Sequence, residues 1–429
     1  MASLRTNFSW ILSGSVIYAA SNWGVLSVFA HTSTPEHLGY FAYGLAIANP
    51  VFSLLSLNLR GLHASDPVGE FHFPHLLAAK NVATILALLI MGIVAVATSG
   101  PFALKATIIL VSIGKAFDAS VNLLLGYYQR RQNMKMLSFA QSANGILSLA
   151  LCSVLLSISG GDPILGALGY AGGSAMSSRL FWAAAKRRER KVGHMDIFRP
   201  IFDRRALKKI VSKGLPLGAA NSVSAANTAV LRHALAASAG MHSLGIFSAL
   251  SYALVPMSIA TNALGQAALP RIADARQRSP GNLIRQSVRL VSLALLIGAS
   301  ASGFALALGE PFLLIFFGPE YSGYSTLLFE LSLAGIFSCG ASVFTYILLG
   351  AGVTRVQIAI ALVGLLLTSI SSAVLIPRYQ IYATPLVIGI SSLSQLLFSA
   401  VTMAYILKRQ QPTHQAASQG GPSSLETSA

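Results

Sequence analysis

The sequence predicts an all-α polytopic membrane protein of about twelve transmembrane helices, arranged in two bundles of six. Three observations support this prediction. The chain is 54% hydrophobic and only 10% charged, whereas a soluble globular protein carries about 25% charged residues. Apolar segments long enough to cross a hydrocarbon core of ~30 Å recur along it. A basic segment near the middle separates the first six of these segments from the last six.

The first six expected spans have mixed polarity. They lie at about 7–30, 39–62, 76–98, 103–128, 137–158 and 164–185. The first contains Trp10, Ser15 and Asn22, and it is longer and more polar than the apolar centre of a cleavable signal peptide. We therefore expect it to remain in the mature protein. Polar residues inside the spans indicate helices that face protein or water as well as lipid.

The last six expected spans follow the basic segment. They lie at about 214–240, 244–269, 284–308, 325–349, 357–376 and 384–407. The predicted organisation is an N-terminal bundle over 1–185, a basic cytoplasmic linker over 186–213, a C-terminal bundle over 214–407 and a disordered cytoplasmic tail over 408–429. Polar residues with Gly, Pro and Ser, as found from Gln410 onward, are typical of disorder.

The basic residues predict the orientation, because Lys and Arg in short loops are retained on the cytoplasmic side. With both termini inside, 25 of the 30 lysines and arginines fall in cytoplasmic segments. The net charge of +17 does not indicate nucleic-acid binding, which needs a basic face on a folded polar domain. For the linker, we favour an orientation signal and a surface helix on anionic lipid over a specific partner site.

An internal repeat relates the two halves. The segments LGYFAYGLAIANP and LGIFSALSYALVP share four residues at one offset of 206 positions: Leu38, Gly39, Phe41 and Pro50 match Leu244, Gly245, Phe247 and Pro256. Six spans per copy predict a pseudo-two-fold axis along the membrane normal, with a binding site between the bundles. Pro50 and Pro256 each free a backbone carbonyl and favour a kink, which is either a gate or a static bend.

Two opposite charges lie in the middle of the fourth expected span, where an unpaired charge costs at least about 2.5–3.5 kcal/mol. Lys115 and Asp118 are three residues apart and so share a helix face on which they can form an ion pair. One interpretation is a structural pair that locks the span to its neighbours. We favour a cavity face on which Lys115 binds an anion, while Asp118 tunes it or binds a coupling cation.

Four further ionisable residues of the expected spans are candidates for a functional or structural role. Arg179 and Arg232 are further candidate anion ligands, whereas His233 is expected to pack or hydrogen bond rather than to shuttle protons. Glu330, about a turn and a half inside a span, is either an interfacial acid or a buried one. The spacing of Gly169 and Gly173 permits close helix approach, which packing explains fully.

No motif for catalysis or cofactor binding is present. The sequence contains no nucleophile elbow, phosphate loop, HExxH or paired catalytic carboxylates, so we expect no enzyme and no cofactor. His72 and His75 in FHFPH provide only two imidazoles and no thiolate, which is a poor metal site. Cys152 and Cys339 lie in separate apolar stretches and are expected to be small core residues without a disulfide.

Three stretches carry a family resemblance that covers most of residues 1–410. They are NFSWILSGSVIYAASNWGVLSVFAHTSTPEHLGYFAYGLAIANPVFSLLSLNLRGLHASD, KAFDASVNLLLGYYQRRQNM and LGIFSALSYALVPMSIATNALGQAALPRIAD. Together with twelve spans in two halves, they resemble the polysaccharide transporter family of the MOP superfamily, which includes the Wzx-type flippases of O-antigen and exopolysaccharide repeat units.

The resemblance implies a MATE-like pair of bundles in the bacterial cytoplasmic (inner) membrane. By alternating access, it would move an undecaprenyl-pyrophosphate-linked oligosaccharide to the periplasmic leaflet for surface polysaccharide synthesis. The implied partners are this lipid-linked substrate, membrane lipids, and a polysaccharide polymerase with other assembly proteins. The pyrophosphate role falls on Lys115, Arg179 and Arg232, and the coupling-ion role on Asp118 or Glu330. The alternatives are a MATE-like cation-coupled multidrug or metabolite antiporter, and a non-transporting scaffold for glycan assembly.

Overall fold

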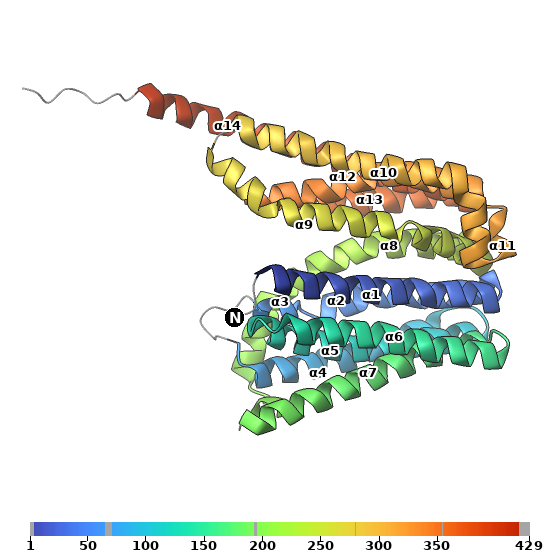
Figure 1. The fold of residues 1–429 in the computed structure, drawn as a ribbon. Coiled ribbons are helices and arrows are strands. Elements are labelled where there is room, and N and C mark those ends of the chain that lie inside the picture. Colours follow the sequence, from blue (N-terminus) through green and yellow to red (C-terminus); the bar gives the residue numbers. More distant parts are fainter. Residues whose placement is uncertain (1–3, 65–70, 193–194, 279, 354, 420–429) are drawn as a thin grey trace, which may run out of the picture. The chain divides into compact units, whose positions relative to one another are not determined.

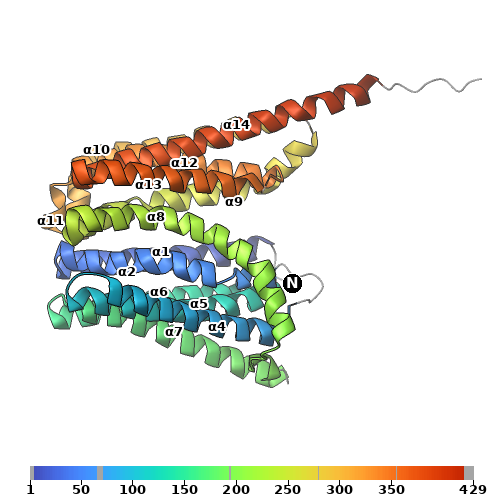
Figure 2. The same cartoon turned by 180° about the vertical axis from the view of Figure 1, so that it is seen from behind.

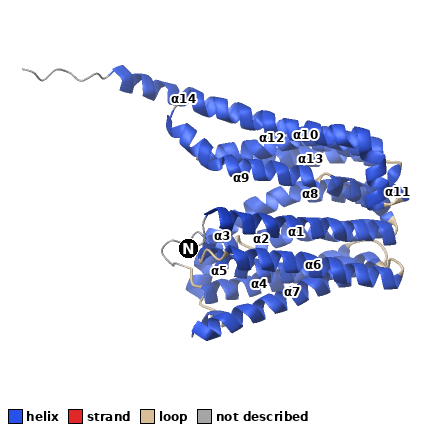
Figure 3. Cartoon of the chain, in the orientation of Figure 1, coloured by secondary structure: helices blue, strands red, loops and turns tan. Residues whose placement is uncertain are grey.

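The computed structural model describes residues 4–64, 71–192, 195–278, 280–353 and 355–419. In these residues all regular secondary structure is helical (Figure 3). The helices, labelled in Figure 1, have these bounds: α1 Leu4–Thr32, α2 Pro35–Leu55, α3 Leu59–Ala64, α4 Phe73–Ala97, α5 Phe102–Arg130, α6 Met134–Ser159, α7 Pro163–Val192, η1 Met195–Phe198, α8 Arg204–Ala253, α9 Val255–Arg278, α10 Pro280–Phe317, α11 Pro319–Ser322, α12 Ser325–Gly350, α13 Arg355–Tyr379, η2 Gln380–Ala383 and α14 Thr384–Gln419.

The prediction of an all-helical, multi-pass membrane protein is confirmed. Within the described residues, nine stretches are long and apolar enough to cross a membrane. Two of the nine, Arg204–Ala253 and Val356–Tyr405, are 50 residues long. The first contains Gly240 in a non-helical conformation (φ 83°, ψ 172°), and the second contains the short 3-10 helix η2. The number of crossings, twelve by sequence, stays a prediction.

The chain forms two compact units, which are described separately. The first contains residues 1–253, 308–326 and 368–384. In it α1 lies beside α6, α6 beside α7, α5 beside α7, and α2 beside α8, as Figures 1 and 2 show from opposite sides. The end of α10 also belongs to this unit: the Ser27 hydroxyl of α1 donates to the Phe316 carbonyl, and the Trp23 and Phe316 ring centroids lie 4.8 Å apart.

Small residues set the distance between α6 and α7. A Cβ at Gly169 would lie 2.6 Å from the Cα of Cys152, and one at Gly173 would collide with the backbone of Ser148. The close approach expected from this glycine spacing is therefore confirmed, since no side chain fits between the two backbones. Cys152 and Cys339 are both free and buried, as predicted.

The α2 and α8 helices cross at a pair of glycines that the repeat relates. A Cβ at Gly39 would collide with the Met241 carbonyl, and one at Gly245 with the Pro35 carbonyl. Pro35 and Met241 are separated by the same 206 positions as Gly39 and Gly245. The contact is therefore reciprocal: each glycine meets the residue four positions before its counterpart.

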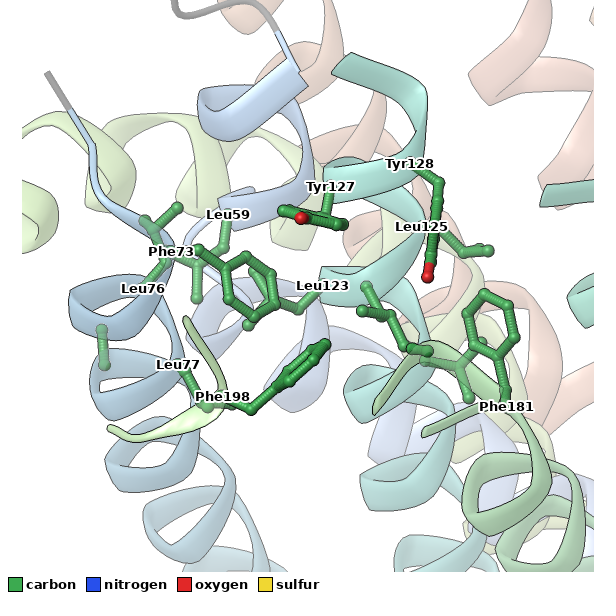
Figure 4. Packing of buried hydrophobic residues seen from close by; sticks show 14 of the residues in the cluster. Leu59, Phe73, Leu76, Leu77, Leu123, Leu125, Tyr127, Tyr128, Phe181 and Phe198 are labelled. Carbon is green, nitrogen blue, oxygen red and sulfur yellow. The ribbon is translucent and has the colours of Figure 1, made fainter. Parts of the chain in front are cut away.

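An aromatic core holds together one end of the first unit, where α5 and α7 terminate. Figure 4 shows Phe73, Tyr127 and Phe198 gathered there, with Tyr128 beside Phe181. The ring centroids of Phe73 and Tyr127 lie 5.1 Å apart, and those of Tyr128 and Phe181 lie 5.8 Å apart. Such pairs contribute ~0.5–1.5 kcal/mol each beyond their buried area, so they fix the ends of α4, α5 and α7.

The second unit contains residues 254–307, 327–367 and 385–429. Hydroxyl groups join its helices: Thr261 of α9 donates to the Cys339 sulfur of α12 at 3.2 Å, and the Ser338 and Ser392 hydroxyls of α12 and α14 lie 2.6 Å apart. Ile272, Val343 and Ile347 are fully buried in its core. Apolar contacts and hydroxyl hydrogen bonds therefore join the described helices of this unit.

Helices extend into the segments predicted to be linker and tail. α7 continues to Val192 and α8 begins at Arg204, so most of residues 186–213 are helical. α14 continues to Gln419, although composition predicts disorder from residue 408, and residues 420–429 lie outside the described chain. The division into two six-helix bundles stays a prediction.

Candidate functional site

A cavity of about 330 Å³ lies within the first unit. Its walls come from α1, α2, α3, α4 and α5 and from the turn between α2 and α3. The lining residues are Tyr18, Asn49, Phe52, Ser53, Leu55, Ser56, Asn58, Leu59, Arg60, Lys80, Ala83, Thr84, Ala87, Lys115, Asp118, Ala119, Asn122 and Leu123. The set contains three cations, one carboxylate and several amide and hydroxyl groups, which can donate and accept hydrogen bonds.

A sharp turn places Arg60 at the cavity. α2 ends at Leu55, and the next residues include Leu57 and Asn58 with positive φ values of 49° and 46°. This turn directs α3 toward α5, where the Arg60 Nε donates to the Gln129 Oε1 at 3.1 Å and the Arg60 Nη1 donates to the Asn122 Oδ1 at 3.4 Å. Burial lowers the pKa of the Arg60 guanidinium, which still stays protonated in proteins.

Two lysines complete the cationic lining. Lys115 comes from α5, which also contributes Asp118, Ala119 and Asn122 to the cavity wall. Lys80 comes from α4, two turns after that helix begins at Phe73. Both side chains are partly buried. Lysine and arginine are the usual protein ligands for phosphate oxygens, so the lining suits an anionic group.

Asp118 is held by neutral donors. The Asn144 Nδ2 of α6 donates to the Asp118 Oδ1 at 2.8 Å, and the Tyr170 hydroxyl of α7 donates to the Oδ2 at 3.2 Å. The close α6–α7 packing brings these two donors together. Among the described residues no ion pair joins Asp118 to Lys115, so the pair that their spacing predicts is not formed. Both carboxylate oxygens instead have uncharged partners.

The other predicted site residues lie outside the cavity. Arg179 is on an exposed face of α7, and Glu330 is an exposed residue of α12 in the second unit. Arg232 of α8 is only 7% exposed, and its guanidinium lies 5.8 Å from the centre of the Tyr252 ring. The structure therefore brings together only Lys115 and Asp118 of the predicted set.

The remaining predictions concern α2, α8 and α9. Pro50 lies inside α2, and its carbonyl accepts a hydrogen bond from the Ser222 hydroxyl at 3.0 Å. Pro256 is the second residue of α9, directly after the break that ends α8. The His233 Nδ1 lies 2.9 Å from the Tyr43 hydroxyl, which confirms a hydrogen-bonding role for this histidine.

Arg60 and Lys80 are the site residues that the sequence reasoning missed. Both had been counted as orientation charges near the ends of spans. One signal could have indicated Lys80. It lies four residues after the start of the third expected span at residue 76, and a charge inside a span by default indicates a functional site.

Residues 72–276 match the model of a family described as "Polysaccharide biosynthesis protein". Over 399 residues the chain is 26% identical to the "Capsular polysaccharide biosynthesis protein CapF" of Staphylococcus aureus, covering 91% of this chain and 97% of that protein. These matches bear out the resemblance read from the three quoted stretches.

Solved structures share the fold at low sequence identity. The lipid II flippase MurJ in an inward closed conformation matches with a TM-score of 0.74 and 13% identity, over 91% of this chain and 86% of that chain. An inward-facing multidrug resistance MATE family transporter of the MOP superfamily matches with a TM-score of 0.71 and 14% identity, over 94% and 99%. The chain thus shares the fold of these two transporter structures.

Proposed function

We propose that this chain, a homologue of polysaccharide biosynthesis proteins with the MOP-superfamily fold, is a flippase for lipid-linked oligosaccharide repeat units. It moves an undecaprenyl-pyrophosphate-linked unit from the cytoplasmic to the periplasmic leaflet, by alternating access, for O-antigen, capsule or exopolysaccharide synthesis. A polymerase and other assembly proteins that act on the delivered unit are its expected partners.

One observation carries the proposal: Arg60, Lys80 and Lys115 line a single cavity. A pyrophosphate that leaves water for a site of low dielectric needs compensating cations and hydrogen-bond donors. The planar Arg60 guanidinium can bind two phosphate oxygens at once, whereas the two lysines act as point charges. Amides such as Asn49 and Asn122 suit the hydroxyl groups of a neighbouring sugar.

The position of the cavity agrees with loading from the cytoplasmic leaflet. Its walls are the C-terminal end of α2, α3, the first half of α4 and the middle of α5. Under the orientation that the basic residues predict, these parts lie toward the cytoplasm. The same orientation puts both termini in the cytoplasm, and we propose the bacterial inner membrane as its location.

We further propose twelve crossings in two six-helix halves related by a parallel repeat. α7 then joins the nine apolar stretches, and Val356–Tyr405 divides at η2. Arg204–Ala253 divides at Gly240, and its second part forms one crossing together with α9. The reciprocal contact of Gly39 and Gly245 is the contact expected where a pseudo-two-fold axis passes between equivalent helices. Pro50 inside α2 and Pro256 at the start of α9 are the proposed bending points.

Asp118 is the proposed site of coupling to a cation, and a proton is the simplest choice. Asn144 and Tyr170 hold the carboxylate without neutralising it. A cation bound at Asp118 would raise the net positive charge of the cavity and so strengthen anion binding. By thermodynamic linkage, a bound anion would then favour binding of the cation. Arg232 and Glu330 are proposed to act at later steps of the transport cycle. Arg179, which is exposed, is not part of the proposed site.

The test uses cells that lack this gene and carry a variant in its place. Lys115→Ala removes one charge-assisted bond worth about 1.5–3 kcal/mol, so transport should fall about 10- to 150-fold. Polyprenyl-pyrophosphate-linked oligosaccharide should accumulate in lipid extracts, as measured by mass spectrometry. Lys105→Ala is the matched control, because Lys105 lies on the same helix but does not line the cavity. Normal transport by the Lys115→Ala protein would overturn the assignment.

A drug or metabolite antiporter is the second candidate, because Asp118 lacks a cationic partner among the described residues and could bind a cationic substrate. Purified protein in vesicles with a proton gradient distinguishes the two candidates. Uptake of a cationic dye that is lost in Asp118→Asn and unaffected by Lys115→Ala would favour the antiporter.

A further inference from the structure

A second basic pocket lies at a different place in the first unit, where α4 and α8 begin. It has a volume of about 240 Å³ and is lined by Phe71, His72, His75, Asp203, Arg205, Ala206, Lys209 and Ile210. The segment before α8 is fixed to the start of α4, because the Ile201 N–H donates to the Pro74 carbonyl at 3.2 Å. The pocket shares no lining residue with the cavity that contains Lys115.

The lining suits an anion. Arg205 and Lys209 lie four residues apart on one face of α8. The same pocket is lined by the imidazoles of His72 and His75, whose ring centroids are 6.1 Å apart. Among the described lining residues, Asp203 carries the one carboxylate. It is used within the helix, since its two oxygens accept the N–H groups of Arg205 and Ala206 at 3.2 Å each.

The surroundings of the pocket suit a lipid. Two stretches able to cross a membrane, Phe73–Ala97 and Arg204–Ala253, both begin at it. Ile201 and Phe202, directly before Asp203, are exposed and can contact acyl chains. At roughly 30 Å³ per water molecule, the volume corresponds to about eight waters, which is room for a phosphate with its glycerol.

We propose that this pocket binds the phosphate of an anionic membrane phospholipid. Arg205 and Lys209 hold the phosphate oxygens, and the histidines close the opposite wall. Basic groups at the membrane surface attract anionic lipids, and a built pocket adds selectivity for the headgroup. A bound lipid would fasten the start of α8 to that of α4. The proposal does not depend on the proposed transport activity.

The first experiment compares two double variants of the full-length protein with equal charge loss. R205A/K209A removes the pocket cations, whereas R204A/K208A removes two neighbours that do not line the pocket. Native mass spectrometry or titration in detergent measures the affinity for dioleoylphosphatidylglycerol. We expect about tenfold weaker binding by R205A/K209A and less than a twofold change for R204A/K208A. Equal losses in both would mean diffuse charge attraction and would overturn the proposal.

A second measurement needs no variant. Wild-type protein is irradiated with phosphatidylglycerol that carries a photoreactive headgroup, and cross-linked peptides are mapped. Cross-links should fall within residues 71–75 and 201–210 and should decrease with excess phosphatidylglycerol but not with phosphatidylcholine. Equal competition by glycerol phosphate would indicate a site for a free phosphate. Preferred competition by a polyprenyl pyrophosphate would indicate a docking site for that lipid, and either result would overturn the phospholipid assignment.

Discussion

Charged groups are neutralised differently at two places along α5. At its C-terminal end, the Arg131 Nη1 donates to the Glu189 Oε1 of α7 at 2.7 Å, and the guanidinium lies 4.3 Å from the centre of the Tyr127 ring. In the middle of the helix, Asp118 has only the neutral donors Asn144 and Tyr170. Lys115 faces the cavity, and no described acid lies within ion-pair distance of it.

We interpret the difference as one between charges with a structural role and charges that bind a ligand. In the ion pair of Arg131 with Glu189, each charge is neutralised by the other, so no ligand is needed. Leaving Lys115 and Asp118 unpaired in a span costs at least about 2.5–3.5 kcal/mol for each charge, although pairing was sterically available at a spacing of three residues. We propose that a ligand completes the site in the working cycle and so offsets this cost.

The largest expected effect on stability comes from the ion pair of Arg131 with Glu189 at the C-terminal end of α5. Arg131→Ala leaves the Glu189 carboxylate, which is 1% exposed, without its cation, and should destabilise the protein by about 3 kcal/mol. Glu189→Gln leaves Arg131, whose side chain is 48% exposed, and should cost about 1 kcal/mol or less. Denaturant unfolding in detergent measures both. Equal losses of stability in the two variants would show that the different burial of Arg131 and Glu189 does not determine the cost.

A second prediction concerns the helices that hold Asp118. Gly173→Val introduces a side chain where even a Cβ collides with the Ser148 backbone, so α6 and α7 must separate, at a cost of about 2 kcal/mol. Gly172→Val is the matched control, because a Cβ there would meet only the Leu151 side chain, at 3.8 Å. Thermal unfolding checks stability. A Gly173→Val protein as stable as this control would show that the helices adjust without loss.

The comparison also shows what the sequence could predict. Lys115 and Asp118 could be identified because ionisable residues are rare in apolar segments. Gly169 and Gly173 predict a close contact from spacing alone, and the structure confirms it. These features depend on residue type and on local helical periodicity, which the sequence states directly.

Arg60 and Arg179 show why the rest could not be predicted. Arg60 reaches the cavity only because the positive φ values at Leu57 and Asn58 turn α3 back toward α5, and neither residue type requires such a turn. Arg179 lies in an apolar segment like Lys115, but α7 presents it on an exposed face. Which face of a helix meets its neighbours is decided by tertiary packing, and one sequence does not contain that information.

The smallest expected effect concerns Asp118, in the middle of α5, and the affinity of the cavity for an anion. Asp118→Asn keeps a side chain of the same size but removes the negative charge from the cavity, so inorganic pyrophosphate should bind about fivefold more tightly, a change of ~1 kcal/mol. Calorimetric titration of both proteins at one fixed pH measures the two affinities.

Asp162→Asn is the matched control for this charge change. Asp162 does not line the cavity, and its Oδ1 accepts the Ile164 N–H at the start of α7 at 2.7 Å, a capping role that asparagine fills equally well. The control should therefore bind pyrophosphate like the wild type. If Asp118→Asn also leaves the affinity unchanged, Asp118 is a structural acceptor for Asn144 and Tyr170. The contrast along α5 would then reduce to two ways of burying a carboxylate, one beside a cation and one beside neutral donors.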